Sequence, residues 1–278
     1  MMKGFVLLLR RVRAFIVRDF QLAISYRMEF FMRMLTVLFI VTTLFFISKT
    51  FITNSDCACA ESPFSQWQNP LAAWITGLAV LNYFMTGFSS LASAIRSEQM
   101  QGTLESVLLS PLNLPTVIVA SSAWDFVQAT FFSFLYLFFG WLFFDVHYRG
   151  NFLLALLFLL LTTLVLACVG ILSASFAMVF KRGDPFGVLL GTGSALFSGV
   201  FFPTQLLGRG FGRVSRALPP TYGLDGIRRV LIEGQGLAQV REPLTVLFIF
   251  LLVLLPFSLW VFGRAVRRAK REGSLIQY

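Results

Sequence analysis

Residues 152–180 read F-L-L-A-L-L-F-L-L-L-T-T-L-V-L-A-C-V-G-I-L-S-A-S-F-A-M-V-F, a run of 29 positions with no charged side chain. An α-helix needs about 20 such residues to cross a hydrocarbon core of about 30 Å. Lys181 and Arg182 follow directly, and basic residues collect on the cytoplasmic side of membrane helices. The run therefore predicts a membrane-spanning helix that ends in the cytoplasm.

The rest of the chain repeats this pattern. Of its 278 residues, 57% are hydrophobic and 13% are charged, whereas an average soluble domain is about 25% charged. We therefore expect an all-α polytopic protein of the cell membrane, built as a single domain. Six apolar stretches predict transmembrane helices at residues 34–52, 71–95, 116–144, 152–180, 186–207 and 243–262. Basic clusters near both ends of the sequence, together with the even number of spans, place both termini in the cytoplasm.

Residues 1–33 are expected to form an amphipathic helix that lies in the membrane interface. Apolar residues recur at helical spacing from Phe5 to Phe20, and the basic residues gather on the opposite face. Such a face favours anionic lipid headgroups. The basic residues singled out on it are Arg10, Arg11 and Arg18.

Residues 208–242 conflict with the charge rule, because they contain six arginines and yet follow a span that runs outward. The rule is most reliable for short loops, so we keep this segment outside and expect one or two short helices that dip into the membrane. The second would begin at Pro219, and Asp225 and Arg228 could pair on its face. The segment and its flank predict an outer gate, or else a plug that only closes the bundle. The gate residues are Phe202, Pro203, Pro219, Pro220, Thr221, Tyr222, Asp225 and Arg228.

Asp125 and Gln128 are the polar residues set most deeply in a predicted span. An acid inside the membrane is costly and suggests a function by default. Asp125 lies only about nine residues into its span, so at a rise of 1.5 Å per residue it is close to the headgroups. We favour a structural pair with Lys181 or Arg182 over a substrate or proton site.

A short polar stretch, residues 98–111, separates the second and third spans on the cytoplasmic side. Gly102 supplies a turn, Thr103 can cap a helix that begins at Leu104, and Pro111 ends it. The helix is amphipathic, with its leucines on one face and Glu105 on the other. Because it is held between two spans, a push on it should reach both.

These residues also carry a resemblance. Glu98, then Gly-Thr-Leu-Glu at 102–105, then Leu-Leu-Ser-Pro-Leu at 108–112 resemble the loop after the second span in the ABC transporter type-2 membrane permease family. A second match lies in Ser-Gly-Val-Phe-Phe-Pro at 198–203, followed by Leu-Pro-Pro-Thr-Tyr-Gly-Leu-Asp-Gly-Ile-Arg-Arg at 218–229. The two motifs occur in the order and on the membrane sides that the family shows.

The resemblance implies the transmembrane permease subunit of an ABC exporter. It implies a dimer, expected to be a homodimer, and two copies of a separate cytoplasmic ATPase subunit that carries ATP and Mg²⁺. Residues 98–111 would be its coupling helix. The residues expected to contact the ATPase are Arg10, Arg11, Arg18, Glu98, Gly102, Thr103, Leu104, Glu105 and Leu108.

Small residues recur every four positions along the predicted fifth span, and a ridge of this kind lets another backbone approach closely. They are Gly187, Gly191, Ala195 and Gly199. The ridge could serve ordinary packing within the subunit. We favour the second interpretation, drawn from the resemblance, in which it lies at the dimer seam or along the substrate path.

Several chemistries are missing from the sequence. A phosphate-binding loop needs a Lys preceded by Gly, and the four lysines follow Met2, Ser48, Phe180 and Ala269. Three cysteines and one histidine suggest no metal site, and no residues pair as a catalytic constellation. Basic residues flank the spans and form no single stripe, so nucleic-acid binding is not expected. We therefore expect no enzyme activity and no cofactor on this chain itself.

The cargo is expected to be a hydrophobic or amphiphilic molecule, such as a drug, an antibiotic or a lipid. The alternative is a polysaccharide or a lipid-linked glycan, but residues 27–37 lack the Leu-Gly-x-x-Trp turn associated with polysaccharide exporters. A channel or secondary transporter that needs no ATP is less favoured, because several charges near mid-membrane or paired broken helices would be expected.

Overall fold

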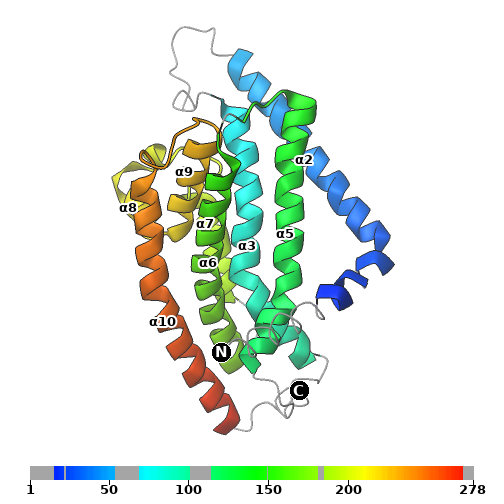
Figure 1. The fold of residues 1–278 in the computed structure, drawn as a ribbon, viewed down its shortest axis with the longest axis vertical. Helices are drawn as coiled ribbons and strands as arrows, with labels where there is room; N and C mark the ends of the chain where they lie inside the picture. The colour runs from blue at the N-terminus through cyan, green and yellow to red at the C-terminus, as the bar shows by residue number, and fades with distance from the viewer. Residues whose placement is uncertain are drawn as a thin grey trace.

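The computed structural model describes residues 16–21, 23–53, 69–100, 114–148, 150–180 and 185–271, and the statements below concern these residues. Their regular elements are all helical (Figure 1). In chain order they are α2 (Arg27–Thr53), α3 (Pro70–Met100), α5 (Leu114–Phe144), α6 (Phe152–Phe180), α7 (Pro185–Phe197), the 3-10 helix η2 (Thr204–Leu207), α8 (Gly208–Ala217), α9 (Pro219–Leu231) and α10 (Arg241–Arg271).

Five helices in the described part of the chain are long and apolar enough to cross a membrane, namely α2, α3, α5, α6 and α10. This confirms the all-α polytopic fold. The uncharged run at 152–180 becomes α6 with the expected bounds. Helix α10 continues past the expected end at 262, where the Arg264 guanidinium lies 3.5 Å from the centre of the Trp260 ring.

Helix α7 differs from the expected fifth span at 186–207, because it ends at Phe197 after 13 residues. At 1.5 Å per residue it is about 20 Å long, which is too short to cross a core of about 30 Å. The chain turns at Gly199, whose φ of 83° is unfavourable for other residues. Pro203 then precedes η2. The apolar run therefore continues beyond the point where the helix stops.

Helix α3 is the centre of the bundle and is largely buried, with α5, α6 and α7 packed around it. Its glycines allow close approach of the neighbouring helices. A methyl group on Gly170 of α6 would lie 2.3 Å from the carbonyl oxygen of Gly87 in α3. The backbones of α3 and α6 are therefore in direct contact, as is common where small residues meet in membrane proteins.

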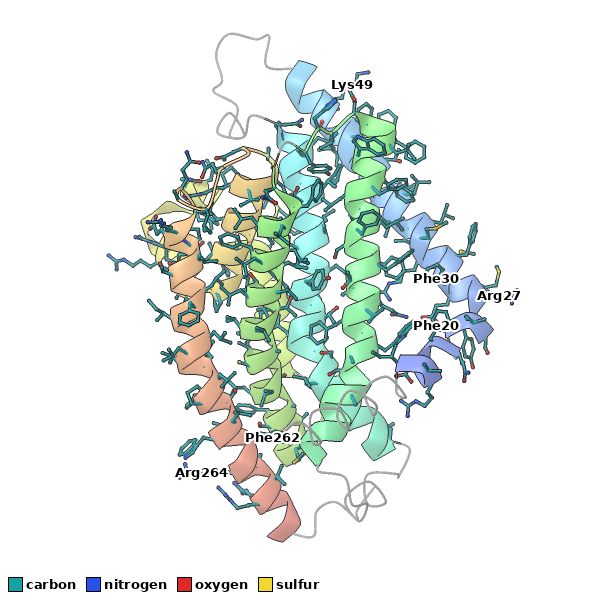
Figure 2. The ribbon with its side chains drawn as sticks, viewed as in Figure 1. Phe20, Arg27, Phe30, Lys49, Phe262 and Arg264 are labelled. Atoms are coloured by element: carbon teal, nitrogen blue, oxygen red, sulfur yellow. The ribbon has the colours of Figure 1, made fainter. Side chains whose placement is uncertain are left out.

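Different helices lie at the two ends of the bundle. Helices α8 and α9 gather at the end where α2 finishes, whereas α10 runs to the opposite end (Figure 1). The 3-10 helix η2 packs against α8. Figure 2 shows Lys49 at the first of these ends and Arg264 near the second. Pro219 and Pro220 occupy the first positions of α9, where a missing N–H costs little.

Helix α2 lies at the side of the bundle and packs on α5 through aromatic rings. The ring of Phe30 lies 5.3 Å from that of Phe131, and Phe20, which precedes α2, meets Trp124 at 5.8 Å (Figure 2). The helix begins at Arg27, earlier than the expected span at 34–52. Of the expected interfacial basic residues, Arg10 and Arg11 lie outside the described residues.

Candidate functional site

A cavity of about 410 Å³ lies at the end of the bundle that holds α8 and α9. We call it the α9 cavity. It is bounded by the start of α3, the turn after α7, η2, the end of α8, and α9 with the turn that follows it. The residues that line it are Asn69, Ala73, Ser198, Pro203, Thr204, Gln205, Arg216, Thr221, Tyr222, Asp225, Arg228, Arg229, Ile232, Glu233 and Gln235.

The cavity brings together most of the residues expected to form an outer gate. Those that line it are Pro203, Thr221, Tyr222, Asp225 and Arg228. Phe202 directly precedes the lining residue Pro203 in sequence and is 47% exposed, but it is not among the lining residues. Pro219 and Pro220 begin α9 and are not among them either.

Arg228 joins three parts of the fold through its guanidinium. Its Nη1 donates to the Gly199 carbonyl at 2.6 Å, and its Nη2 donates to the Ala73 carbonyl at 2.8 Å and the Val200 carbonyl at 3.1 Å. These acceptors belong to the start of α3 and to the turn after α7. Burial lowers the pKa of Arg228 to about 9, partly opposed by Asp225, so the group stays charged at neutral pH.

The prediction that Asp225 pairs with Arg228 is wrong. Asp225 Oδ2 lies 2.8 Å from Nη2 of Arg229, one helical turn further along α9. Arg228 is directed instead into the bundle, where main-chain carbonyls accept its hydrogen bonds. Sequence spacing allowed either partner, since residues three and four apart share a helix face.

Two side chains of α9 fasten it to the end of α8. Thr221 Oγ1 donates to the Ser215 carbonyl at 2.7 Å, and the Tyr222 hydroxyl donates to the Arg216 carbonyl at 2.9 Å. Carbonyls at the end of a helix lack partners within it. These bonds therefore fix the corner between α8 and α9 and one wall of the cavity.

The small residues of α7 face the interior of the same chain. A methyl group on Gly191 would lie 2.8 Å from Sδ of Met85 in α3, and Ala195 is 8% exposed. Gly187 and Gly199 are also buried. The structure therefore shows the packing interpretation for this face, and its place at a dimer seam or along the pathway stays a prediction.

The polar residues of α5 meet a cation from α2. Nη1 of Arg33 donates to Oε1 of Gln128 at 3.2 Å, and the same guanidinium lies 4.4 Å from the centre of the Phe132 ring. The positive charge of Arg33 favours the ionised form of Asp125, and the negative charge of Asp19 disfavours it. The partners expected for Asp125 were Lys181 and Arg182, which lie outside the described residues.

The expected coupling residues are mostly outside the described part of the chain. Glu98 lies in the last turn of α3. Arg18 is described, and its Nε lies 2.8 Å from Oδ1 of Asp19. The other expected coupling residues lie beyond the described ranges, namely Arg10, Arg11, Gly102, Thr103, Leu104, Glu105 and Leu108. Cys57 and Cys59 also lie beyond them.

The fold and the cavity define a helical, multi-pass membrane protein with a short helix α7 and a hydrogen-bonded corner between α8 and α9. The sequence matches the family described as ABC-2 type transporter over residues 8–232. Because this match covers most of the chain, the protein belongs to that family. It is therefore the membrane component of a transporter. No curated protein matches the sequence.

Proposed function

We propose that this chain is the permease subunit of an ABC exporter that moves a hydrophobic or amphiphilic molecule, such as a drug or a lipid, outward across the membrane. Membership of the ABC-2 family supports the transporter class. The family also implies a partner ABC ATPase subunit. Since none of the four lysines follows a glycine, ATP and Mg²⁺ would bind that partner, in two copies for each dimer of permeases.

Helix α3 is the observation that carries this proposal. Its 31 residues span about 46 Å and end where residues 98–111 begin. At its other end, the Ala73 carbonyl accepts from Arg228, and Trp74 Nε1 donates to the Phe201 carbonyl at 3.0 Å. One buried helix therefore connects the predicted coupling segment to the α9 cavity, so displacement of the first would be felt at the second.

The basic residues of α10 support a cytoplasmic position for the end of this helix. Arg264, Arg267 and Arg268 lie near its last turns, away from the α9 cavity (Figure 2). Clusters of this kind favour the cytoplasmic side. The α9 cavity would then open toward the outer compartment, where cargo leaves.

Reversal of charge at Glu105 is expected to abolish binding of the ATPase. Residue 105 would project from the polar face of the predicted coupling helix, so Glu105→Arg would reverse the charge at the proposed docking contact. The measurement is co-elution of the ATPase with the purified permease. Glu242→Arg, the same change in the first turn of α10, is the matched control and should keep co-elution. Equal loss in both variants, or undiminished transport without a nucleotide-binding partner, would contradict the proposal.

A second copy of the chain is expected to lie against the exposed face of α7. Val188 and Leu189 are 64% and 70% exposed there, and Thr192 adds a hydroxyl to the same surface. A polar group on a membrane helix usually faces protein or a water-filled path.

Leu189→Cys, in a Cys57→Ser, Cys59→Ser background, should therefore form disulfide-linked dimers on mild oxidation. The readout is a band of doubled mass on a non-reducing gel. Leu252→Cys in α10 starts from a similar exposure of 64% and should stay monomeric because lipid covers it. Cross-linking at 252 but not at 189 would refute this dimer face.

A further inference from the structure

Helix α8 presents an apolar face and a basic face, and both are open to the surroundings. Phe211 and Val214 are three residues apart and share one side of the helix, whereas Arg213 and Arg216, with the same spacing, share the opposite side. Phe211 is 58% exposed and Val214 is 45% exposed. Both arginines are exposed as well.

The positive charge of α8 is not balanced nearby. The helix contains three arginines, and residues 185–224 contain no Asp or Glu. Neither Arg213 nor Arg216 forms an ion pair with another residue in the described ranges. Arg216 reaches only its own helix, where its Nε donates to the Gly212 carbonyl at 3.3 Å. A surface of this sign attracts an anionic partner.

Contacts within the chain hold α8 at few points. The ring of Phe211 stacks on that of Phe197 at 5.6 Å, and the corner to α9 is fixed by Thr221 and Tyr222. Among the described side chains of the helix only Ser215 is buried.

The sequence of α8 is also a poor helix former by itself. A methyl group on Gly210 or Gly212 would meet no neighbouring atom of the described residues within 4 Å, so packing does not require these glycines. Glycine disfavours a helix, and ten residues are few for a helix without outside support. An amphipathic helix gains such support when its apolar face enters a membrane interface.

The place of α8 in the bundle brings it to such an interface. Helix α10 is one of the five helices that can cross a membrane, and it begins at Arg241. Figure 1 shows α8 at the left edge of the view, at the level where α10 begins. The ends of membrane-spanning helices lie near the lipid headgroups. A lipid surface is therefore the partner that meets both faces of α8.

We propose that α8 lies in the membrane interface and binds anionic phospholipid, with Phe211 and Val214 among the acyl chains and Arg213 and Arg216 at the phosphate oxygens. Arginine suits phosphate because its hydrogen bonds are charge-assisted. Lipid binding would account for the basic composition of residues 208–242, which conflicts with an outer position by the charge rule. The proposal needs neither cargo nor ATPase, so it is independent of the export function.

The test is fluorescence quenching of the full chain in phosphatidylcholine vesicles. Val214→Cys, in a Cys57→Ser, Cys59→Ser background, carries a bimane label, and the remaining Cys168 is 3% exposed and should not react. Phosphatidylglycerol or phosphatidylcholine with brominated chains is included at equal mole fraction, and the ratio of their quenching constants measures lipid preference at α8. We expect phosphatidylglycerol to be preferred by about fivefold or more. Both leaflets contain the quencher, so the result does not depend on which way the chain faces.

Arginine variants of the labelled chain identify the groups responsible. Arg213→Gln and Arg216→Gln should each lower the preference by about two- to fivefold. Arg241→Gln removes the same charge from the start of α10 and should leave the preference unchanged. Equal losses from Arg213→Gln and Arg241→Gln would assign the preference to general surface charge and overturn the role of α8.

Two further labels complete the design. Leu252→Cys in α10 is 64% exposed and should be quenched equally by both lipids, because it lies within a span. Phe211→Cys is a second reporter on the apolar face of α8 and replaces Val214→Cys if that variant aggregates.

Three results at position 214 would overturn the proposal. Equal quenching by both brominated lipids would mean that α8 does not select anionic lipid. Quenching by aqueous iodide and by neither lipid would place the helix in water. Protection from iodide and from both lipids would mean that protein, such as a second copy of the chain, covers this face.

Discussion

Arg228→Met is expected to lower the free energy of unfolding by about 3 kcal/mol or more, because it removes three hydrogen bonds from a charged donor. Replacing a buried charge with an apolar side chain can be harmless when its partner is replaced as well. Here the acceptors are main-chain carbonyls at 199 and 200, which remain and lose their donor. For a chain of this size the loss corresponds to a fall in melting temperature of about 6–12 °C.

Thermal unfolding of the detergent-purified chain is the measurement, with Arg228→Lys and Arg229→Met alongside. A lysine keeps the charge but cannot reach three carbonyls with one nitrogen, so it should fall between the native chain and Arg228→Met. Arg229→Met loses a half-exposed ion pair with Asp225 and should cost less than about 1 kcal/mol. Similar melting temperatures for Arg228→Met and Arg229→Met would show that the Arg228 contacts do not hold this end of the bundle.

Gly170→Ala is expected to destabilise the contact between α3 and α6 by about 1–3 kcal/mol. The added methyl group would lie 2.3 Å from the carbonyl oxygen of Gly87. A backbone atom cannot turn aside as a flexible side chain can, so the two helices must separate. Because α3 is the central helix, the separation should also lower the yield of folded protein.

Gly263→Ala in α10 is the matched control, since a methyl group there would have no other atom within 4 Å. Alanine favours a helix over glycine by about 1 kcal/mol, so this variant should be as stable as the native chain or more so. The comparison is made by melting temperature and by the monodisperse fraction on size exclusion. A tolerated Gly170→Ala would mean that α3 and α6 are not packed backbone to backbone.

The positions of the long helices were predictable because one physical signal dominates them. A span must exclude charge over about 20 residues, and the run at 152–180 coincides with α6. The same signal misplaced the end of α7, since hydropathy stays high beyond Phe197 while the backbone turns at Gly199. The end of α7 is therefore set by the backbone turn at Gly199, which hydropathy alone does not reveal.

Only part of the site could be predicted from the sequence. Five of the fifteen residues that line the cavity were expected gate residues, located by proline positions and the residues of α9. The partner of Arg228 was missed because its acceptors are carbonyls, one of them 155 positions away in α3. The spacing of small residues in α7 indicated a close neighbour, but not that Gly191 would pack against the Met85 and Phe88 side chains of α3 in the same chain.

The reliance of Arg228 on main-chain oxygens has an evolutionary consequence. Every residue type has a main-chain carbonyl. Substitutions at positions 73, 199 and 200 can therefore accumulate without loss of the hydrogen bond to Arg228. Coevolution between these positions and 228 should therefore be faint. The exception is Gly77, where a methyl group would lie 2.9 Å from Nη2 of Arg228, so homologous chains that keep this arginine should retain glycine at that position.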